Sequence, residues 1–276
     1  DLVHNEYGDV LDVASLDRVL KKINPDEVYN LAAQSHVRIS FDIPQFTVQT
    51  NALGALNVLE SVRLHCPEAK FYQASSSEMF GNSVDKDGRQ RESTKMMPTS
   101  PYGCAKLFSY SMTRNYRNGY NLFCSNGILF NHESPRRAAN FVTTKIVKNA
   151  VLISKGKLSK LELGNLDSKR DWGHSKDYVR AMQLIMNHDK PDDFIVSTGE
   201  TRSIRELCDL VFTKLGLDYR EYVTQNPKYM RPEELDYLCG DCTKIRTTLN
   251  WKPEYSFEML IDDMLESWLR HYELHK

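Results

Sequence analysis

The sequence has no hydrophobic run long enough to cross a membrane and no excess of charge of either sign. Its longest apolar stretches, such as residues 121–130, fall far short of the roughly 20 residues that a membrane-spanning helix needs. Lysine and arginine number 36 against 37 aspartate and glutamate residues, without a long run of one sign. The sequence therefore predicts neither membrane insertion nor nucleic-acid binding through a basic surface.

Cysteine is also scarce, with six in 276 residues. This number is too small for a disulfide scaffold in a chain of this length and favours a reducing cytoplasm. Cys239-Gly-Asp-Cys242 is a single C-x-x-C pair. A zinc site would need a second pair of ligands nearby, and a redox role would need a thioredoxin-like context, which the sequence does not show. We therefore expect no metal site.

The sequence does contain short β-rich runs that alternate with longer helical patterns, which is typical of a parallel α/β sheet covered on both faces. Strands are predicted over residues 28–32, 70–75, 123–130 and 194–198. Helices are predicted over residues 44–65, 101–118, 140–155, 175–188 and 256–272. A further helix begins at Ser203, which forms a capping-box pattern with Glu206.

The strict alternation ends near residue 133, and residues 160–172 and 219–242 are rich in loop-forming residues. We therefore expect two parts. A doubly wound, Rossmann-like sheet would comprise residues 1–132 and about 174–200. A smaller α/β lobe that binds the substrate would comprise about residues 133–173 and 201–276.

The strongest local signal for chemistry is Tyr102-Gly-Cys-Ala-Lys106 at the start of a predicted helix. Residues four apart share a helix face, so the phenol and the ammonium group can converge. A lysine cation at ~4 Å is worth roughly 4 kcal/mol at an effective dielectric constant of 20, or about 3 pKa units for a phenol. This would bring Tyr102 into range for proton transfer, although the same spacing is also common in exposed helix pairs.

Hydroxyl groups and one carboxylate follow the predicted strand over residues 70–75, in the run Ser75-Ser-Ser-Glu78. Ligands of open α/β sheets bind at the carboxyl ends of the strands. Ser76 could hydrogen-bond a substrate hydroxyl, and Glu78 could act as a general acid or base. The alternative is a serine-rich turn with a solvated glutamate.

The order of these motifs resembles the extended short-chain dehydrogenase/reductases. Asn30-Leu-Ala-Ala-Gln-Ser35 follows one strand, Ser75-Ser-Ser-Glu78 the next, and Tyr102-x-x-x-Lys106 comes after both. Within that superfamily, residues 34–41, 130–137, 164–174 and 229–233 resemble the GDP-mannose 4,6-dehydratase family. The resemblance extends from Gly8 to about Trp251.

The resemblance implies a lyase that uses NADP and converts GDP-mannose into GDP-4-dehydro-6-deoxy-mannose. Tyr102 would take the proton of the sugar C4 hydroxyl while hydride leaves C4, and Lys106 would hold the cofactor ribose. Glu78 would remove the C5 proton as the C6 hydroxyl departs, and hydride would then return to C6. Ser76 stands where the family usually has threonine, so the hydroxyl is kept.

The resemblance also implies which residues contact the two ligands. The NADP contacts would be Asp9, Val10, Leu31, Ala32, Ala33, Gln34, Ser35, Phe46, Lys106, His132 and Arg137. Phe46 replaces a tyrosine, and the lost hydroxyl would weaken cofactor binding by about 1 kcal/mol if it made a hydrogen bond. The substrate contacts would be Ser76, Asn131, Lys145, Asn165, Arg170, Arg231 and Glu234.

Arginine suits the diphosphate of such a substrate, because its planar guanidinium group offers paired donors. The alternative for Arg170 and for Arg231 is a solvated surface side chain. Trp172 and His174 also match the family, and we assign them to packing and loop geometry.

One element of this fold is missing from the sequence, the glycine-rich turn that binds a dinucleotide pyrophosphate. The early glycines are Gly8 and Gly54, and Gly54 falls within a helical pattern. In the strand order 3-2-1-4-5-6 the first strand is central, so without it strand 4 has an unpaired edge. We expect roughly 60 upstream residues, about two short βα units, in the working protein.

Other functions stay open at this point. An NDP-sugar epimerase or reductase shares the tyrosine and the lysine but needs no carboxylate where Glu78 stands. Thymidine-sugar dehydratases usually carry an Asp-Glu pair in place of Ser77-Glu78. A non-catalytic scaffold of the same fold would bind no NADP(H). By resemblance we expect a homodimer or homotetramer, in which the helices at residues 44–65 and 101–118 pair with a partner's copies in a four-helix bundle.

Overall fold

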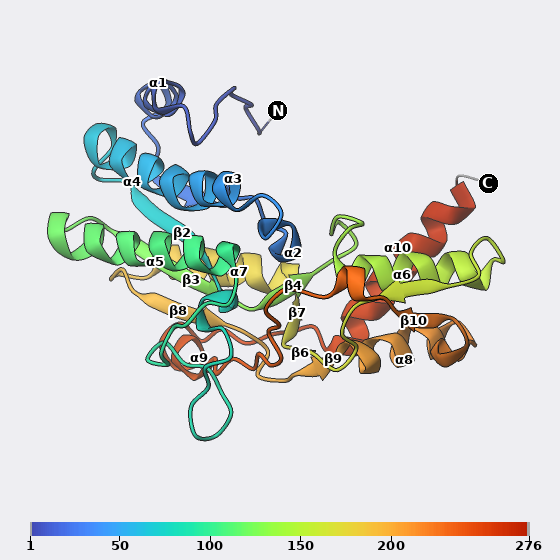
Figure 1. Ribbon diagram of the computed structural model, residues 1–276. Helices are drawn as coiled ribbons and strands as arrows, with labels where there is room; N and C mark the ends of the chain where they lie inside the picture. Colours follow the sequence, from blue (N-terminus) through green and yellow to red (C-terminus); the bar gives the residue numbers. More distant parts are fainter. Residues whose placement is uncertain (1, 275–276) are drawn as a thin grey trace.

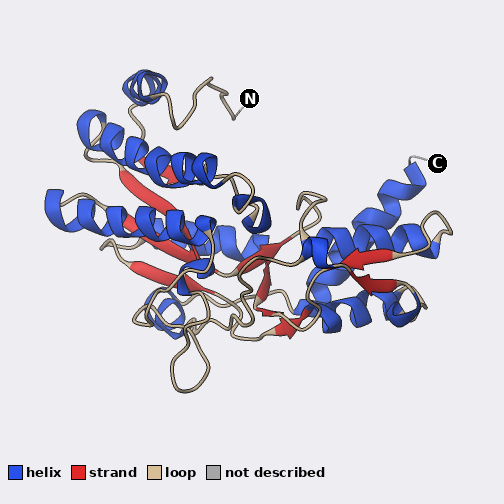
Figure 2. Cartoon of the chain, in the orientation of Figure 1, coloured by secondary structure: helices blue, strands red, loops and turns tan. Residues whose placement is uncertain are grey.

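The computed structural model describes residues 2–274, and a four-stranded parallel sheet is its central feature (Figures 1 and 2). The strand order is β1-β2-β3-β8. The strands are β1 (Glu27–Asn30), β2 (Lys70–Ser76), β3 (Cys124–Leu129) and β8 (Asp193–Val196). The predicted α/β class and the four predicted strands are confirmed, and β1 lies at one edge of the sheet.

Helices cover both faces of this sheet (Figure 1). One face carries α3 (Pro44–Val48), α4 (Gly54–His65) and α5 (Pro101–Tyr120), with α1 (Val13–Ile23) packed on α4. The other face carries α7 (Ser175–Asn187) and α9 (Thr243–Leu249). The sequence predicted neither α1 nor α9.

The single helix predicted over residues 44–65 contains a π-helical turn, η1 (Gln49–Leu53), between α3 and α4. A Cβ atom added at Gly54, the first residue of α4, would lie 2.6 Å from Val10 Cγ2. Glycine at this position therefore allows the segment before α1 to approach α4 closely.

Each face of the sheet has its own hydrophobic core. Phe71 and Cys124 pack with Val62 under α4 and α5. Tyr72 and Phe194 pack on the opposite face in a core that also includes Ile245 and Trp251. The segment around α9 therefore packs against the sheet, although the sequence placed it in the substrate-binding lobe.

The lobe is built around α6 (Val142–Ser154), α8 (Ile204–Lys214) and α10 (Phe257–Leu274), which enclose a third core. The stretches predicted as loops contain short strands, because so few main-chain pairings give little periodic signal. They pair with one another or with short strands elsewhere: β4 (Asn131–Glu133) with β7 (Trp172–His174), β5 (Leu161–Leu163) with β10 (Val223–Gln225), and β6 (Lys169–Arg170) with β9 (Arg202–Ser203).

Short helical segments complete the fold: α2 (Val37–Ser40), the 3₁₀ turn η2 (Ser77–Phe80), η3 (Tyr219–Glu221) and η4 (Pro227–Tyr229). The predicted capping box at the start of α8 is present, since Ser203 and Glu206 bond each other's backbone amides. Within residues 2–274, no helix is long and apolar enough to span a membrane.

Candidate active site

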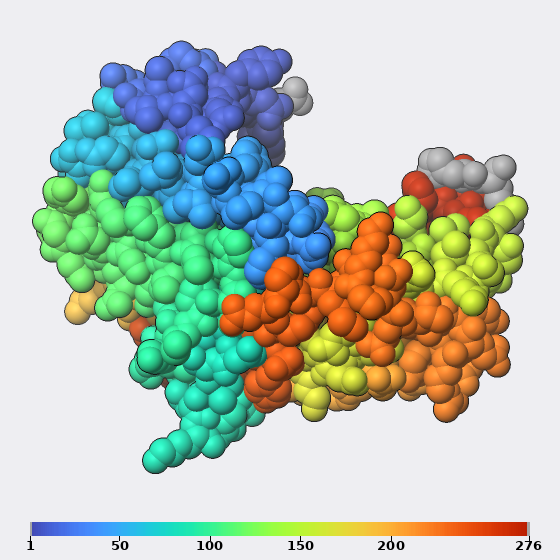
Figure 3. All heavy atoms as spheres, in the orientation of Figure 1, coloured from blue at the N-terminus to red at the C-terminus, as the bar shows by residue number. Residues whose placement is uncertain are grey.

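A cavity of about 910 Å³ opens at the carboxyl ends of the central strands and continues to the lobe. Most of the residues that the sequence predicted for the site line it. They are Leu31, Ala33, Ser35, Ser76, Glu78, Tyr102, Lys106, Asn131, His132, Arg137, Lys145, Asn165, Arg170, Arg231 and Glu234. On the molecular surface, the orange segment near residue 230 lies against the blue segment that contains α2 (Figure 3).

Five predicted cofactor contacts lie outside the cavity lining: Asp9, Val10, Ala32, Gln34 and Phe46. The Gln34 side chain is engaged by α3, where its Nε2 donates to Thr47 Oγ1 at 3.0 Å. Asp9 accepts a bond from Leu11 N at 2.8 Å, and Phe46 is 51% exposed. The roles of these five residues in cofactor binding stay predictions.

Ser76 and Tyr102 meet where the end of β2 faces the start of α5. Ser76 Oγ accepts a bond from Glu78 N at 3.2 Å and is also hydrogen-bonded to the Tyr102 phenol. The start of α5 is fixed by Pro101 and by Ser100, whose Oγ accepts from Gly103 N at 3.0 Å. Proline and a serine cap are the residues that favour a helix start. Local sequence therefore places the phenol at the strand ends.

Burial raises the pKa of Tyr102 to about 12, and the bond from Ser76 only partly offsets this effect. The lowered phenol pKa expected from Lys106 is therefore wrong for this state of the protein. Lys106 Nζ donates to Ala74 O at 2.8 Å and lies 5.8 Å from the centroid of the Tyr102 ring. Burial lowers the pKa of Lys106 to about 8.

Glu78 is buried, and both of its carboxylate oxygens lie 3.2 Å from Arg231 Nη1. The backbone of Arg231 is held by Glu234, whose Oε1 accepts from Arg231 N at 2.8 Å. The carboxylate is therefore not the solvated side chain of the alternative interpretation. It forms an ion pair with a loop 153 residues further along the chain.

Arg170 is buried at 6% exposure, which contradicts the interpretation of this residue as a surface arginine. Burial lowers the pKa of Arg170 to about 10, and the nearby positive charge of Arg231 contributes to the decrease. Two guanidinium groups thus share one side of the cavity. Such a pair favours an anion that can accept several hydrogen bonds, such as a diphosphate.

Three further predicted contacts lie on the lobe side. Asn131 Oδ1 is buried and has no hydrogen-bond partner among the residues that the structure describes, so a ligand could supply one. Lys145 Nζ donates to Glu162 O at 2.7 Å and lies 3.6 Å from the centroid of the Tyr229 ring. Asn165 Oδ1 accepts from Asp167 N, which shapes the turn that it occupies.

His132 and Arg137 come from the segment after β3. His132 stacks on Tyr178, with 4.7 Å between ring centroids, and burial lowers its pKa to about 4. Arg137 Nε lies 3.0 Å from Glu133 Oε2, and burial raises the pKa of Glu133. Glu133 is not among the predicted site residues, although its position four residues before Arg137 is a sequence signal for such an ion pair.

Sequence reasoning also missed a contact across the cavity between the first part of the chain and the lobe. His36 Nε2 lies 3.3 Å from Asn140 O, and the His36 ring lies 5.2 Å from that of Phe141. All three residues line the cavity. Trp172 stacks on Phe257 and also lines the cavity, whereas His174 bonds Asp263 at 2.9 Å, so packing accounts for both side chains.

Comparison with known families agrees with this geometry. Residues 2–264 match the family model described as GDP-mannose 4,6 dehydratase. The chain belongs to this family. A relative from Homo sapiens named GDP-mannose 4,6 dehydratase is 45% identical and covers 95% of this chain and 75% of its own length. GDP-mannose 4,6 dehydratase 2 of Arabidopsis thaliana is 48% identical, with 96% and 71% covered.

Solved structures of other proteins share the fold of this family member. RMD from Pseudomonas aeruginosa, complexed with NADPH, has a TM-score of 0.87 at 25% identity and covers 98% of this chain and 89% of its own. UDP-glucose 4-epimerase from Thermotoga maritima has a TM-score of 0.85 at 24% identity, with 97% and 84% covered. The Rossmann-like architecture is therefore confirmed.

Proposed function

We propose that this protein is a lyase that converts GDP-mannose into GDP-4-dehydro-6-deoxy-mannose and uses NADP. The observation that carries the proposal is the meeting of Ser76, Glu78, Tyr102 and Lys106 in one cavity. The names of the human and Arabidopsis relatives support the substrate. The NADPH in the Pseudomonas aeruginosa structure supports the cofactor.

The first step is oxidation of the sugar at C4. A bound nicotinamide would supply the acceptor for the C4 hydride and the source of the hydride that C6 receives. Tyr102 takes the C4 hydroxyl proton, and Ser76, already bonded to the phenol, holds the hydroxyl in line. Because burial raises the phenol pKa, proton removal needs the positive charge of Lys106 close to Tyr102.

The second step is loss of water across C5 and C6. The 4-keto group acidifies the C5 proton, and Glu78 removes it as the C6 hydroxyl departs with a proton as water. C5 takes up a proton again when hydride is added at C6. In this structure both oxygens of Glu78 pair with Arg231. A bound diphosphate competes for the same guanidinium group, so substrate binding makes the carboxylate available as a base.

In this proposal, residues at the carboxyl ends of the strands would hold the cofactor. Leu31 is exposed at the end of β1, and Ala33 and Ser35 line the cavity beside it. Small and polar residues at this edge allow a dinucleotide to approach the backbone. Lys106 at the same edge offers an ammonium group to the ribose hydroxyls. Equilibrium titration with NADP(H) and NAD(H) tests the preference, and binding of neither would support the scaffold alternative.

The remaining proposals concern organisation and surroundings. We propose that the sheet and its helices, including the segment around α9, form the cofactor-binding part and that the lobe binds the sugar nucleotide. Leu53, Leu64 and Phe108 are exposed on the helices expected to pair in a homodimer or homotetramer, which light scattering tests. All six cysteines are free, which supports the cytoplasm as the location.

Turnover on a panel of nucleotide sugars tests the proposed substrate. The protein is incubated with a catalytic amount of NADP and GDP-mannose, UDP-glucose or dTDP-glucose, and the products are identified by mass and by proton NMR. We expect GDP-mannose alone to lose water and gain a C6 methyl group. Conversion of another nucleotide sugar with GDP-mannose unchanged would contradict the proposal.

A further inference from the structure

One register row of the sheet is polar on the face that α5 covers. The residues of this row are direct partners across the four strands: Asn30 on β1, Gln73 on β2, Asn126 on β3 and Asp193 on β8. All four are buried, with at most 6% of any of them exposed. The preceding row on this face is apolar and consists of Val28, Phe71 and Cys124. We call the four residues the polar row.

The side chains of the polar row satisfy one another, as buried polar groups must. Asn30 Nδ2 donates to Gln73 Oε1 at 2.9 Å, and Gln73 Nε2 donates to Ala74 O at 3.2 Å. Asn126 Nδ2 donates to Asp193 Oδ1 at 2.9 Å, and Asn126 Oδ1 accepts from Ser75 Oγ at 2.9 Å. The side-chain hydrogen bonds within the row thus form two pairs, Asn30 with Gln73 and Asn126 with Asp193.

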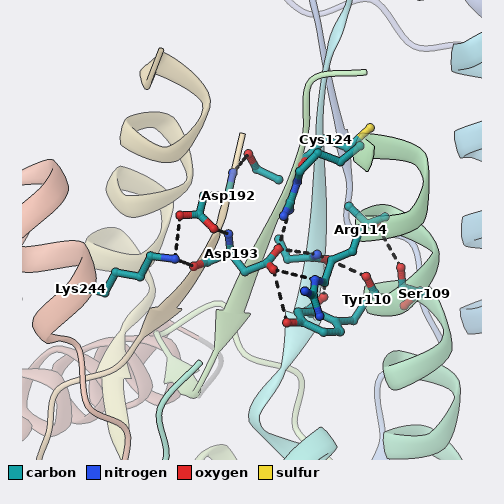
Figure 4. Close-up of polar contacts among 12 residues, drawn as sticks. Ser109, Tyr110, Arg114, Cys124, Asp192, Asp193 and Lys244 are labelled. Carbon is teal, nitrogen blue, oxygen red and sulfur yellow. Dashed lines mark hydrogen bonds and ion pairs between the residues drawn. The ribbon is translucent and has the colours of Figure 1, made fainter. Parts of the chain in front are cut away.

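The Asp193 end of the row holds the second half of α5 (Figure 4). Its carboxylate accepts bonds from Arg117 Nη2 at 2.5 Å and from the Tyr110 hydroxyl at 3.3 Å, and it lies 3.4 Å from Arg114 Nε. Asn126 Nδ2 also reaches Tyr110 O at 3.4 Å.

The other pair of the row, through Gln73, is connected to the first half of α5 by a shared acceptor. Ala74 O receives both Gln73 Nε2 and Lys106 Nζ. The positions on α5 that make these contacts, 106, 110, 114 and 117, follow one another at helical spacing along one face. Polar contacts therefore attach both halves of α5 to the sheet, the first half at Ala74 O and the second half at Asp193.

We infer that the polar row positions α5 on the sheet so that Tyr102 and Lys106 lie beside Ser76 and Glu78 at the strand-end side of the cavity. Hydrophobic packing is non-directional, so it alone allows a helix to shift along or rotate over the strands. Hydrogen bonds to fixed strand positions remove that freedom. A displacement of about 1 Å in a reacting group can cost on the order of 100-fold in rate. The catalytic consequence of this inference rests on the function proposed above.

Stability alone is a weak explanation of the polar row. Replacing buried charges by well-packed apolar groups is often neutral or stabilising, whereas removing one partner is costly. A row of valine and isoleucine side chains would satisfy the same strands without any desolvation of a carboxylate. The polar row instead supplies directional hydrogen bonds, and these bonds constrain the position of the helix that carries Tyr102. Asp193 is thus a positioning residue.

Hydrogen exchange measured by mass spectrometry tests this inference on the full chain without substrate. In Asp193→Asn the carboxylate loses its charge but keeps its shape, so we expect residues 101–108 to exchange about tenfold faster than in the parent protein. The matched control is Lys244→Met. Lys244, on α9, bonds Asp193 O at 2.8 Å and Asp192 Oδ2 at 2.7 Å at the start of the same strand (Figure 4). We expect no faster exchange of residues 101–108 in this control.

Kinetics gives the second measurement. We expect kcat of Asp193→Asn to fall about tenfold with KM for GDP-mannose within about twofold, because position and not binding is disturbed. Tyr110→Phe, which removes only one hydroxyl from Asp193, is the milder variant if Asp193→Asn folds poorly, and it should speed the same amides about twofold. Unchanged exchange in residues 101–108, or an equal increase throughout the chain, would overturn the inference. Because exchange needs no substrate, this outcome is separate from a failure of the proposed function.

Discussion

The strand-end side of the cavity is held by regular secondary structure, whereas the opposite side is held by side chains on a loop. Tyr102 and Lys106 belong to α5, and Ser76 ends a central strand. Arg231 and Glu234 lie between η4 and α9. Arg231 pairs with Glu78, and the Glu234 backbone accepts a bond from Asn82 Nδ2. The groups proposed for C4 oxidation, Ser76, Tyr102 and Lys106, are thus set before the substrate arrives, as preorganised catalysis requires. Arg231, on the loop, can adjust its position to the diphosphate of the substrate.

This contrast predicts that substitutions on the first side change kcat and that those on the second change KM. The largest effect is expected for Tyr102→Phe. Removal of the hydroxyl that takes the C4 proton should lower kcat by about 1,000-fold with little change in KM. Tyr120→Phe, at the exposed far end of α5, is the matched control. A Tyr102→Phe variant with kcat near that of the control would assign the proton transfer to another group.

Glu78→Gln separates the two chemical steps. The amide cannot take the C5 proton, so loss of water should slow by about 100-fold, while C4 oxidation continues and reduced cofactor accumulates. Stopped-flow absorbance of the reduced nicotinamide measures the first step, and product mass measures the second. If both steps slow equally, Glu78 acts on C4 oxidation as well and its assignment to C5 is wrong.

Burial of Lys106 on the strand-end side sets function against stability, because the ammonium group that activity needs destabilises the fold at neutral pH. Its native pKa of about 8 lies below the ordinary value, so between about pH 8 and 10.4 the unfolded chain binds more protons and stability rises with pH. Below pH 8 the buried cation costs on the order of 3 kcal/mol. Lys106→Met should therefore be inactive but more stable at pH 7, where Gln73 still donates to Ala74 O.

Urea unfolding of the parent and of Lys106→Met at several pH values measures this difference. The advantage of the variant should decline as pH rises from about 8 to 10. An advantage that is constant with pH, or a variant that is less stable throughout, would show that the burial of the ammonium group is not what sets its native pKa.

The smallest effect is expected on the loop side. Arg231→Lys keeps the charge but loses the planar fork, so KM for GDP-mannose should rise about tenfold with kcat within about twofold. Arg205→Lys, which alters a surface ion pair with Asp167, is the matched control and should change neither constant. A drop in kcat equal to the rise in KM would place Arg231 on the strand-end side of the comparison.

Local sequence predicted much of the fold and many members of the site, because strands, helix caps and motifs depend on residues that are close together in the sequence. The start of α5 is an example, with Ser100 and Pro101 as its capping residues. The helix α1 could have been found, since Val13, Leu16 and Leu20 follow a helical period after Asp12, its cap. The helix α9, with seven residues, is too short for such a pattern.

Features that depend on distant contacts could not be predicted. The bond between Glu78 and Arg231 joins positions 153 residues apart. The raised pKa of Tyr102 follows from burial, which the spacing to Lys106 does not report. The members of the polar row are ordinary residues in four separate strands, and only the register of the sheet brings them into line.

The fate of the C4 hydrogen tests the proposed reaction most directly. GDP-mannose that carries deuterium at C4 is incubated with the protein and a catalytic amount of unlabelled NADP, and the product is examined by deuterium NMR. We predict that the label moves from C4 to the new C6 methyl group, because the hydride removed at C4 is the one returned. A product whose label has stayed at C4, or has been lost to water, would contradict the proposed function.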